Sequence, residues 1–126
     1  MPLYLKTRIT AVGPEVADLA EGGVLILFAD GAPPELAEVS VLHAVQEGPL
    51  ETPPSPGTPI RIGPLSAKVT AIGDTAWKKV REIGHVVISF NGASQAERPG
   101  EICATALDPA ALVEALTAGA VIAIGE

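Results

Sequence analysis

Hydrophobic residues in this sequence form short segments that are separated by glycine and proline. Residues 3–12 (LYLKTRITAV) alternate between apolar and polar side chains, and this period of two predicts a half-buried strand. Residues 24–28 (VLILF) are a continuous apolar run of strand length, which predicts a strand buried on both sides or a barrel stave. Further strands are predicted in segments of similar character, at residues 39–47, 60–63, 66–73, 85–92, 100–107 and 120–126.

The predicted helices are short. Residues 75–84 (TAWKKVREIG) place Trp77, Val80 and Ile83 roughly on one helical face, and Gly84 follows as the residue that ends the helix. Residues 14–23 are predicted to form a helical or turn-like piece, and residues 29–36 are predicted to form a turn. Residues 108–116 are predicted to form a short helix that is capped by Asp108.

Regular spacing of turns, without alternation of strands and helices, favours an all-β fold. We expect a small sandwich or barrel of roughly seven short strands with one or two short helices. The prolines of residues 48–59 (GPLETPPSPGTP) remove backbone donors, so this segment is predicted to be an exposed loop. No repeat, low-complexity tail or linker is visible, and residues 1–126 are therefore expected to form one domain.

Composition and charge narrow the class of protein. Hydrophobic residues make up 48% of the chain but aromatic residues only 3%, so the core is expected to consist of Val, Ile, Leu and Ala. The net charge of −7 argues against nucleic-acid binding, which needs a basic surface. No signal peptide and no apolar run of roughly 20 residues is visible, so we expect a cytoplasmic protein without membrane insertion.

Motifs for bound cofactors or metals are absent from the sequence. There is no phosphate-binding loop of the GxxxxGK[ST] or GxGxxG type and no HExxH pair, and neither a cofactor nor a metal is expected. Cys103, the single cysteine, lies in an apolar strand and is predicted to be a buried small hydrophobe. His43 and His85, together with a carboxylate, leave open a weaker interpretation as a small metalloenzyme.

His43 is the residue that the strand pattern singles out. Alternation places it on the same face as Val39, Val41 and Val45. If that face is the core, the imidazole is a structural group that needs a hydrogen-bond partner on each nitrogen. If that face is a shallow apolar surface, His43 lies at the centre of a docking site. The pattern alone favours the structural role, and it favours a turn or cap role for His85.

A set of ordered motifs carries a resemblance to a known family. The segments YLKTRITAVG, LILFADGAPPELAE, VLHAVQEG, VTAIG, REIGHVVISFNG and AERPGEI follow one another along the chain. Together they resemble the IIA component of the glucitol/sorbitol-specific bacterial phosphotransferase system. The resemblance runs from about Tyr4 to Ile102, and residues 108–126 match it less well.

The resemblance implies a fold and a role. The fold is a Greek-key-like β-barrel of about six main strands. The role is that of a phosphocarrier whose phosphorylated histidine falls on His43. It implies that His43 accepts a phosphoryl group, through Nε2, from the phosphohistidine of HPr. The acceptor is then the IIB unit of a IIB/IIC sugar permease, and the transported sugar is sorbitol (glucitol) in the family's case.

The chemistry of imidazole suits this role. A side chain with a pKa near 6.5 is largely neutral at cellular pH, so one nitrogen keeps a lone pair that can attack phosphorus. Transfer then depends mainly on positioning, in-line geometry and stabilisation of charge by neighbouring donors. A β-strand holds such a nucleophile in a fixed position.

One residue departs from the family's pattern. Relatives carry a second histidine two residues after the phosphorylated one, and here that position is Val45. His85, in a matching GH pair, is therefore a candidate helper that hydrogen-bonds the phosphoryl group or the His43 ring. The alternative function is a β-barrel binding or regulatory module that is related to such carriers but no longer phosphorylated.

Overall fold

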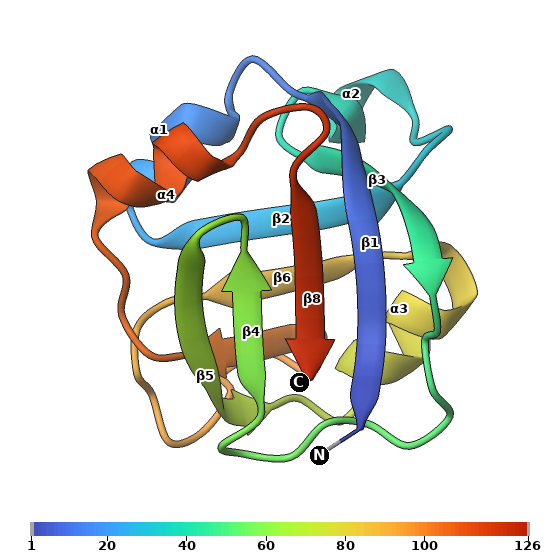
Figure 1. The fold of residues 1–126 in the computed structure, drawn as a ribbon, viewed down its shortest axis with the longest axis vertical. Helices are drawn as coiled ribbons and strands as arrows, with labels where there is room; N and C mark the ends of the chain where they lie inside the picture. The colour runs from blue at the N-terminus through green and yellow to red at the C-terminus, as the bar shows by residue number, and fades with distance from the viewer. Residues whose placement is uncertain (1, 126) are drawn as a thin grey trace.

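The strands of this protein close into a barrel (Figure 1). The computed structural model describes residues 2–125, so Met1 and Glu126, the ends of the predicted domain and of the last predicted strand, lie outside the described residues. The strands are β1 (Leu3–Val12), β2 (Val24–Ala29), β3 (Val41–Glu47), β4 (Pro59–Ile62), β5 (Leu65–Ile72), β6 (Val86–Ser89), β7 (Glu101–Ala104) and β8 (Val121–Gly125). The helices are α1 (Val16–Glu21), α2 (Pro34–Ala37), α3 (Ala76–Ile83) and α4 (Pro109–Ala115).

Strand order around the barrel is β1-β3-β2-β6-β7-β5-β4-β8, and pairing of β8 with β1 closes it. The pairs β2/β3 and β6/β7 are parallel, and the other pairs are antiparallel. Within residues 2–125, closure leaves no long unpaired edge that could pair with another chain. Helices α1 and α4 pack against each other, and they contact β2 and β5 respectively (Figure 1).

The prediction of a small all-β barrel is confirmed, but the numbers of elements differ. The described residues form eight strands instead of about six, because each of the eight apolar segments in the sequence becomes a separate strand. They also form four helices instead of one or two. One of the additional helices is α2, a single turn of four residues that begins at Pro34 within the segment predicted to be a turn. The fixed φ of proline suits the first position of a helix.

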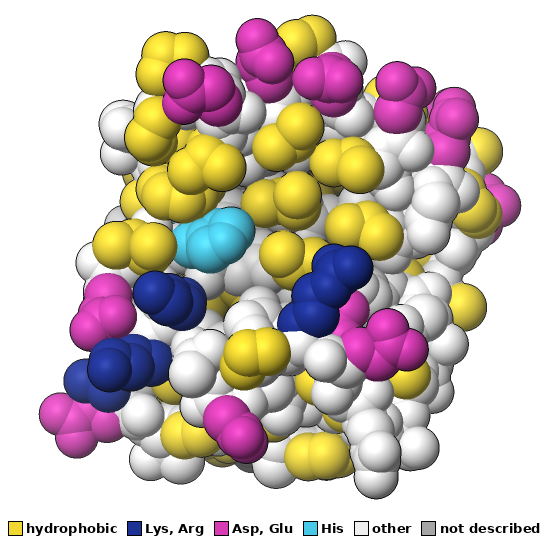
Figure 2. Space-filling model, turned by 180° about the vertical axis from the view of Figure 1, so that it is seen from behind, with side chains coloured by type: hydrophobic (Ala, Val, Ile, Leu, Met, Phe, Trp, Pro, Cys, Tyr) yellow, Lys and Arg dark blue, Asp and Glu magenta, His cyan; other side chains and the backbone are white. Residues whose placement is uncertain are grey.

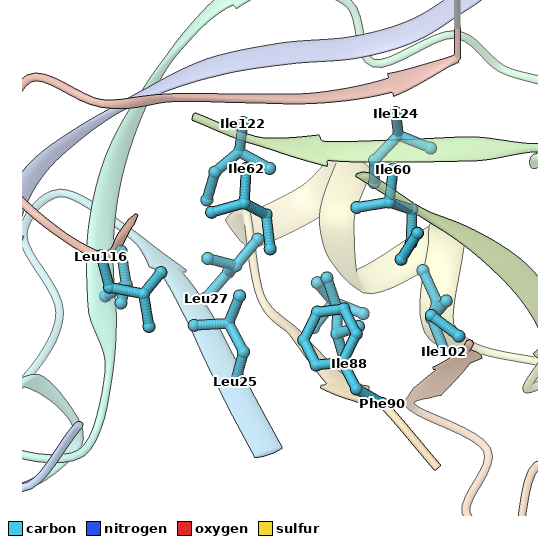
Figure 3. Close-up of a cluster of buried hydrophobic side chains, with 14 of the residues drawn as sticks. Leu25, Leu27, Ile60, Ile62, Ile88, Phe90, Ile102, Leu116, Ile122 and Ile124 are labelled. Atoms are coloured by element: carbon cyan, nitrogen blue, oxygen red, sulfur yellow. The ribbon is translucent and has the colours of Figure 1, made fainter. Parts of the chain in front are cut away.

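Inward-facing aliphatic side chains from the barrel strands form the core (Figure 3). Ile, Leu, Val and Ala make up most of it, as the composition predicts, and Trp77 and Phe90 are its aromatic members. The residues labelled in Figure 3 are Leu25, Leu27, Ile60, Ile62, Ile88, Phe90, Ile102, Leu116, Ile122 and Ile124.

Helix α3 connects β5 to β6 and buries two of the three residues of the predicted face, whereas the third, Ile83, is 42% exposed. Trp77 and Val80 are buried, and the Trp77 indole N–H donates to the carbonyl of Leu50 at 2.7 Å. Gly84 ends the helix in the left-handed conformation (φ 65°), and its N–H donates to the carbonyl of Val80 at 3.0 Å. The prediction that Gly84 ends this helix is thus confirmed. No helix within residues 2–125 is long and apolar enough to cross a membrane.

Candidate functional site

His43 lies in the middle of β3, between β1 and β2. It is paired with Ile9 of β1 on one side and with Ala29 of β2 on the other. Its side chain is only 1% exposed, like that of Val41 on the same face. The strand pattern allowed either the core or a shallow apolar surface for His43, and the structure places it in the core.

Both ring nitrogens of His43 are hydrogen-bonded. The hydroxyl oxygen of Thr7 lies 2.6 Å from Nδ1, and the carbonyl oxygen of Gly84 lies 2.7 Å from Nε2. A carbonyl oxygen can only accept, so Nε2 carries the proton and donates to Gly84. In the neutral ring the lone pair is therefore on Nδ1, where it accepts from the Thr7 hydroxyl. The two contacts together fix one tautomer.

The surroundings of His43 favour its neutral form. Removal of the ring from water lowers the pKa of His43 below its ordinary value, while the hydrogen bond to Gly84 and the nearby Asp30 carboxylate oppose this effect. Asp30 is held beside the ring because its backbone N–H donates to the His43 carbonyl at 3.1 Å, and its carboxylate accepts from the Thr10 hydroxyl. A neutral imidazole is the form that can act as a nucleophile.

Acidification is expected to destabilise the wild-type protein more than a His43→Gln variant. Because burial lowers the pKa of His43 in the folded state, the unfolded chain takes up the proton first, from about pH 6.5 downwards. Folding stability is thus highest above that pH and falls as the pH drops towards the folded-state pKa. Urea unfolding between about pH 5 and pH 8 measures the difference in free energy of unfolding between the two proteins. A difference that is independent of pH would contradict the lowered pKa.

His85 follows Gly84 and is partly exposed. Its Nδ1 donates to the carbonyl oxygen of Leu27 at 3.1 Å, and its ring lies 5.0 Å from the ring of Phe28. No hydrogen bond joins the rings of His43 and His85 among the described residues. Both predicted site residues therefore lie next to Gly84, His43 through a hydrogen bond to its carbonyl oxygen and His85 as the following residue in the chain.

One face of the molecule combines a histidine with apolar side chains. Figure 2 shows a histidine bordered by hydrophobic side chains, with Lys and Arg side chains below it and a row of acidic side chains along the upper edge. Val45, where the resemblance implies a second histidine, is 42% exposed although it pairs with Thr7 across β1 and β3. The structure therefore exposes Val45 and buries His43.

Thr7 and Gly84 belong to the site, although the sequence did not identify them. A polar residue at an inward position of β1, between the apolar Leu5 and Ile9, was the available signal for Thr7. Gly84 was predicted only to end a helix, and no pattern indicated that its carbonyl oxygen reaches a strand 41 residues away. Within residues 2–125, no three His, Cys, Asp or Glu side chains are grouped so that they could hold a metal ion.

A second buried polar cluster, around Glu101, has a structural character. The Glu101 carboxylate accepts from the Ser89 hydroxyl at 2.6 Å and from the Glu97 backbone N–H at 3.1 Å. These contacts, the Ser89 bond foremost, lower the pKa of Glu101. Cys103 is fully buried beside it, and burial raises the pKa of its thiol. The prediction of a buried Cys103 is confirmed, and a raised pKa disfavours the reactive thiolate.

Comparison with known proteins identifies the family. The family model described as "PTS system glucitol/sorbitol-specific IIA component" matches residues 4–123, which includes most of the C-terminal segment that the sequence motifs left out. Glucitol/sorbitol-specific EIIA components of Shigella flexneri and of Escherichia coli K12 are each 35% identical over 102 residues, which cover 81% of this chain and 81% of theirs.

A solved structure shares the fold. The crystal structure of a PTS system IIA component from Enterococcus faecalis V583 matches with a TM-score of 0.71, over 93% of this chain and 96% of that chain. The two chains are 19% identical in sequence, so this similarity shows a shared fold alone. The chain therefore belongs to the glucitol/sorbitol-specific IIA components of the phosphotransferase system, a membership that supports a phosphocarrier role in sugar transport.

Proposed function

We propose that His43 accepts a phosphoryl group from the phosphohistidine of HPr and passes it to the IIB unit of a glucitol/sorbitol permease. The observation that supports this most directly is the neutral imidazole at the position of the family's histidine, held between Thr7 and Gly84. A ring with fixed orientation loses little entropy when it is brought in line with a donor. As such a carrier, the protein acts in the cytoplasm as one domain of residues 1–126.

Access to His43 requires a movement, because the ring is 1% exposed. The residue that covers Nε2 is Gly84, at the end of α3 and between the exposed Ile83 and the partly exposed His85. Displacement of this turn opens a path to the ring without breaking any strand pairing. Arg81 lies in the last turn of α3, three residues before Gly84.

The surface on one side of the molecule suits a protein partner. Apolar side chains lie above and beside the visible histidine, Lys and Arg side chains lie below it, and acidic side chains line the upper edge of this area (Figure 2). HPr-type donors are expected to present basic residues around an apolar contact, which the apolar area and its acidic upper edge would complement (Figure 2). The sugar itself needs no pocket here, because a IIA component contacts protein partners.

Incubation of the protein with phosphoenolpyruvate, enzyme I and HPr tests the proposal. We expect about one acid-labile phosphate per chain, and tandem mass spectrometry under non-acidic conditions should locate it on His43. Omission of HPr should abolish the label. Subsequent addition of the IIB unit should remove it. Absence of label with an active HPr would contradict the proposal.

His85→Gln is expected to slow phosphorylation without abolishing it. Glutamine keeps a side-chain N–H for the carbonyl oxygen of Leu27 but cannot become a cationic donor to a phosphoryl oxygen. Loss of one such donor corresponds to a rate reduction of about tenfold. Stopped-time labelling by phosphorylated HPr measures the rate. An unchanged rate would exclude a helper role for His85.

The burial of His43 also supports a second candidate. A ring with both nitrogens satisfied is the arrangement expected of a structural histidine, and Val45 occupies the place of the relatives' second histidine. On this alternative the protein is a binding or regulatory module that is no longer phosphorylated. The labelling experiment separates the two, since the module would remain unlabelled and still bind HPr or IIB.

A further inference from the structure

The contact between Thr7 and His43 has a role beyond holding the ring. We infer that Thr7 is a positioning residue whose hydroxyl reverses its hydrogen bond with Nδ1 when His43 becomes reactive. This inference rests on the proposed function, because it concerns the state in which His43 receives the phosphoryl group.

The two ring nitrogens of His43 are covered by different parts of the fold, a strand of the barrel on one side and a turn on the other. Nδ1 faces Thr7, which is 0% exposed and lies in β1, a strand paired with β3 on one side and with β8 on the other. Nε2 faces the carbonyl of Gly84, in a helix-ending turn that belongs to no strand. Uncovering Nδ1 would require opening the barrel, whereas uncovering Nε2 requires only movement of a turn. Nε2 is therefore the nitrogen that can meet a donor.

The resting tautomer cannot use Nε2. Its proton is on Nε2, where it is donated to Gly84, so the lone pair is on the inaccessible Nδ1. The ring becomes reactive only after Nε2 has given its proton to water in the open state and Nδ1 has gained one from the Thr7 hydroxyl, which regains a proton from water, so that the ring stays neutral. The Gly84 carbonyl supports the resting tautomer alone, because it can only accept. The Thr7 hydroxyl supports both tautomers, because it can donate to a bare Nδ1 and accept from Nδ1–H.

The transfer step balances with this arrangement. The Nε2 lone pair of neutral His43 attacks the phosphorus of a donor phosphohistidine whose second ring nitrogen is protonated. The new bond joins phosphorus to Nε2, the bond from phosphorus to the donor nitrogen breaks, and the donor ring leaves as neutral imidazole. His43 becomes a phosphohistidine that is protonated on Nδ1. Throughout this step Nδ1–H donates to the Thr7 oxygen, which stabilises the positive charge that the ring acquires.

Thr7→Val tests the role of the hydroxyl while keeping a β-branched side chain of similar shape in β1. In this variant the buried Nδ1–H of the reactive ring has no acceptor, and we expect phosphoryl acceptance to be slower by roughly ten- to a hundredfold. Thr7→Ser restores a hydroxyl and is expected to recover most of the rate. Thr58→Val is the matched control, because Thr58 is also buried (1% exposed) and its hydroxyl has no partner among the described residues.

Nitrogen-15 NMR of the histidine rings provides a readout that a purely structural role would not change. In wild-type protein we expect the proton on Nε2 before phosphorylation, and phosphorus on Nε2 with the proton on Nδ1 afterwards. Phosphorus on Nδ1, or equal rates for wild type and Thr7→Val, overturns the inference and leaves the proposed function intact. A wild-type protein that takes no label on His43 contradicts the proposed function itself. The wild-type spectra decide the matter even if Thr7→Val fails to fold.

Discussion

His43→Gln is expected to take no acid-labile phosphate from HPr. The amide of glutamine is not a nucleophile. His85, the remaining histidine, donates through Nδ1 to the Leu27 carbonyl and keeps a lone pair on Nε2, so any label that remained in this variant would identify His85 as a second acceptor. The expected loss is complete, in contrast to the partial loss in His85→Gln. Gel-based labelling with phosphorylated HPr and intact-mass measurement at neutral pH quantify both variants. Label in His43→Gln at the wild-type level would show that another residue is phosphorylated.

Folding must be verified for this variant, because His43 is a buried link between β1, β3 and the end of α3. Glutamine can replace some of the contacts to Thr7 and Gly84 but not both with the same geometry. The expected cost is about 1–3 kcal/mol of unfolding free energy, which a domain with a stability of 5–15 kcal/mol tolerates. Cooperative urea unfolding and retained binding to HPr would show that the loss of label is chemical.

The two functional candidates differ in this experiment. If His43 is a phosphoryl acceptor, the substitution removes a label that the wild type carries. If His43 is only structural, wild type and variant are both unlabelled and differ only in stability. The buried, doubly hydrogen-bonded ring is compatible with both outcomes, since it describes the resting state. A carrier needs a second, open state, which the proposed function assigns to displacement of the Gly84 turn.

Much of the fold was predictable because local patterns dominate it. The alternation of residues 3–12 predicted β1 with the bounds that the structure has, and Gly84 was identified as the end of α3. A four-residue helix such as α2 escapes pattern reasoning, because a single turn has no period to detect. The numbers of strands and helices were accordingly underestimated.

The site was less predictable than the fold. The motif order drew attention to His43 and His85, but the partners of His43 come from positions 36 and 41 residues away. Those contacts depend on β1 pairing with β3 and on the end of α3 packing beside β2, and neither is encoded in a local pattern. The alternation of residues 39–45 placed His43 and Val45 on one face, yet the structure buries the first and exposes the second. Irregular pairing between Lys6 and Thr7 occurs where β1 runs alongside Val45.

Gly84→Ala is expected to destabilise the protein by roughly 2–5 kcal/mol. The residue has φ 65°, a conformation that costs an L-residue about 1–2 kcal/mol. An added Cβ would also lie 2.8 Å from the Cβ of Ala29 and 3.1 Å from its backbone nitrogen. Ala29 has no flexible side chain that could move aside, so the overlap must be relieved by a shift of the turn or of β2. Urea unfolding measures the change.

Gly92→Ala separates these two contributions. Gly92 has φ 67°, almost the same as Gly84, but nothing lies within 4 Å of its added Cβ. It is therefore expected to lose only the conformational part, about 1–2 kcal/mol. The excess loss in Gly84→Ala then reports the contact with Ala29, which pairs directly with His43. A shift of the turn also moves the acceptor of Nε2–H, so the nitrogen-15 signals of His43 should change in Gly84→Ala and stay unchanged in Gly92→Ala. Equal stability losses in both variants would mean that the turn absorbs the added methyl group without strain, and that it opens more easily than the packing indicates.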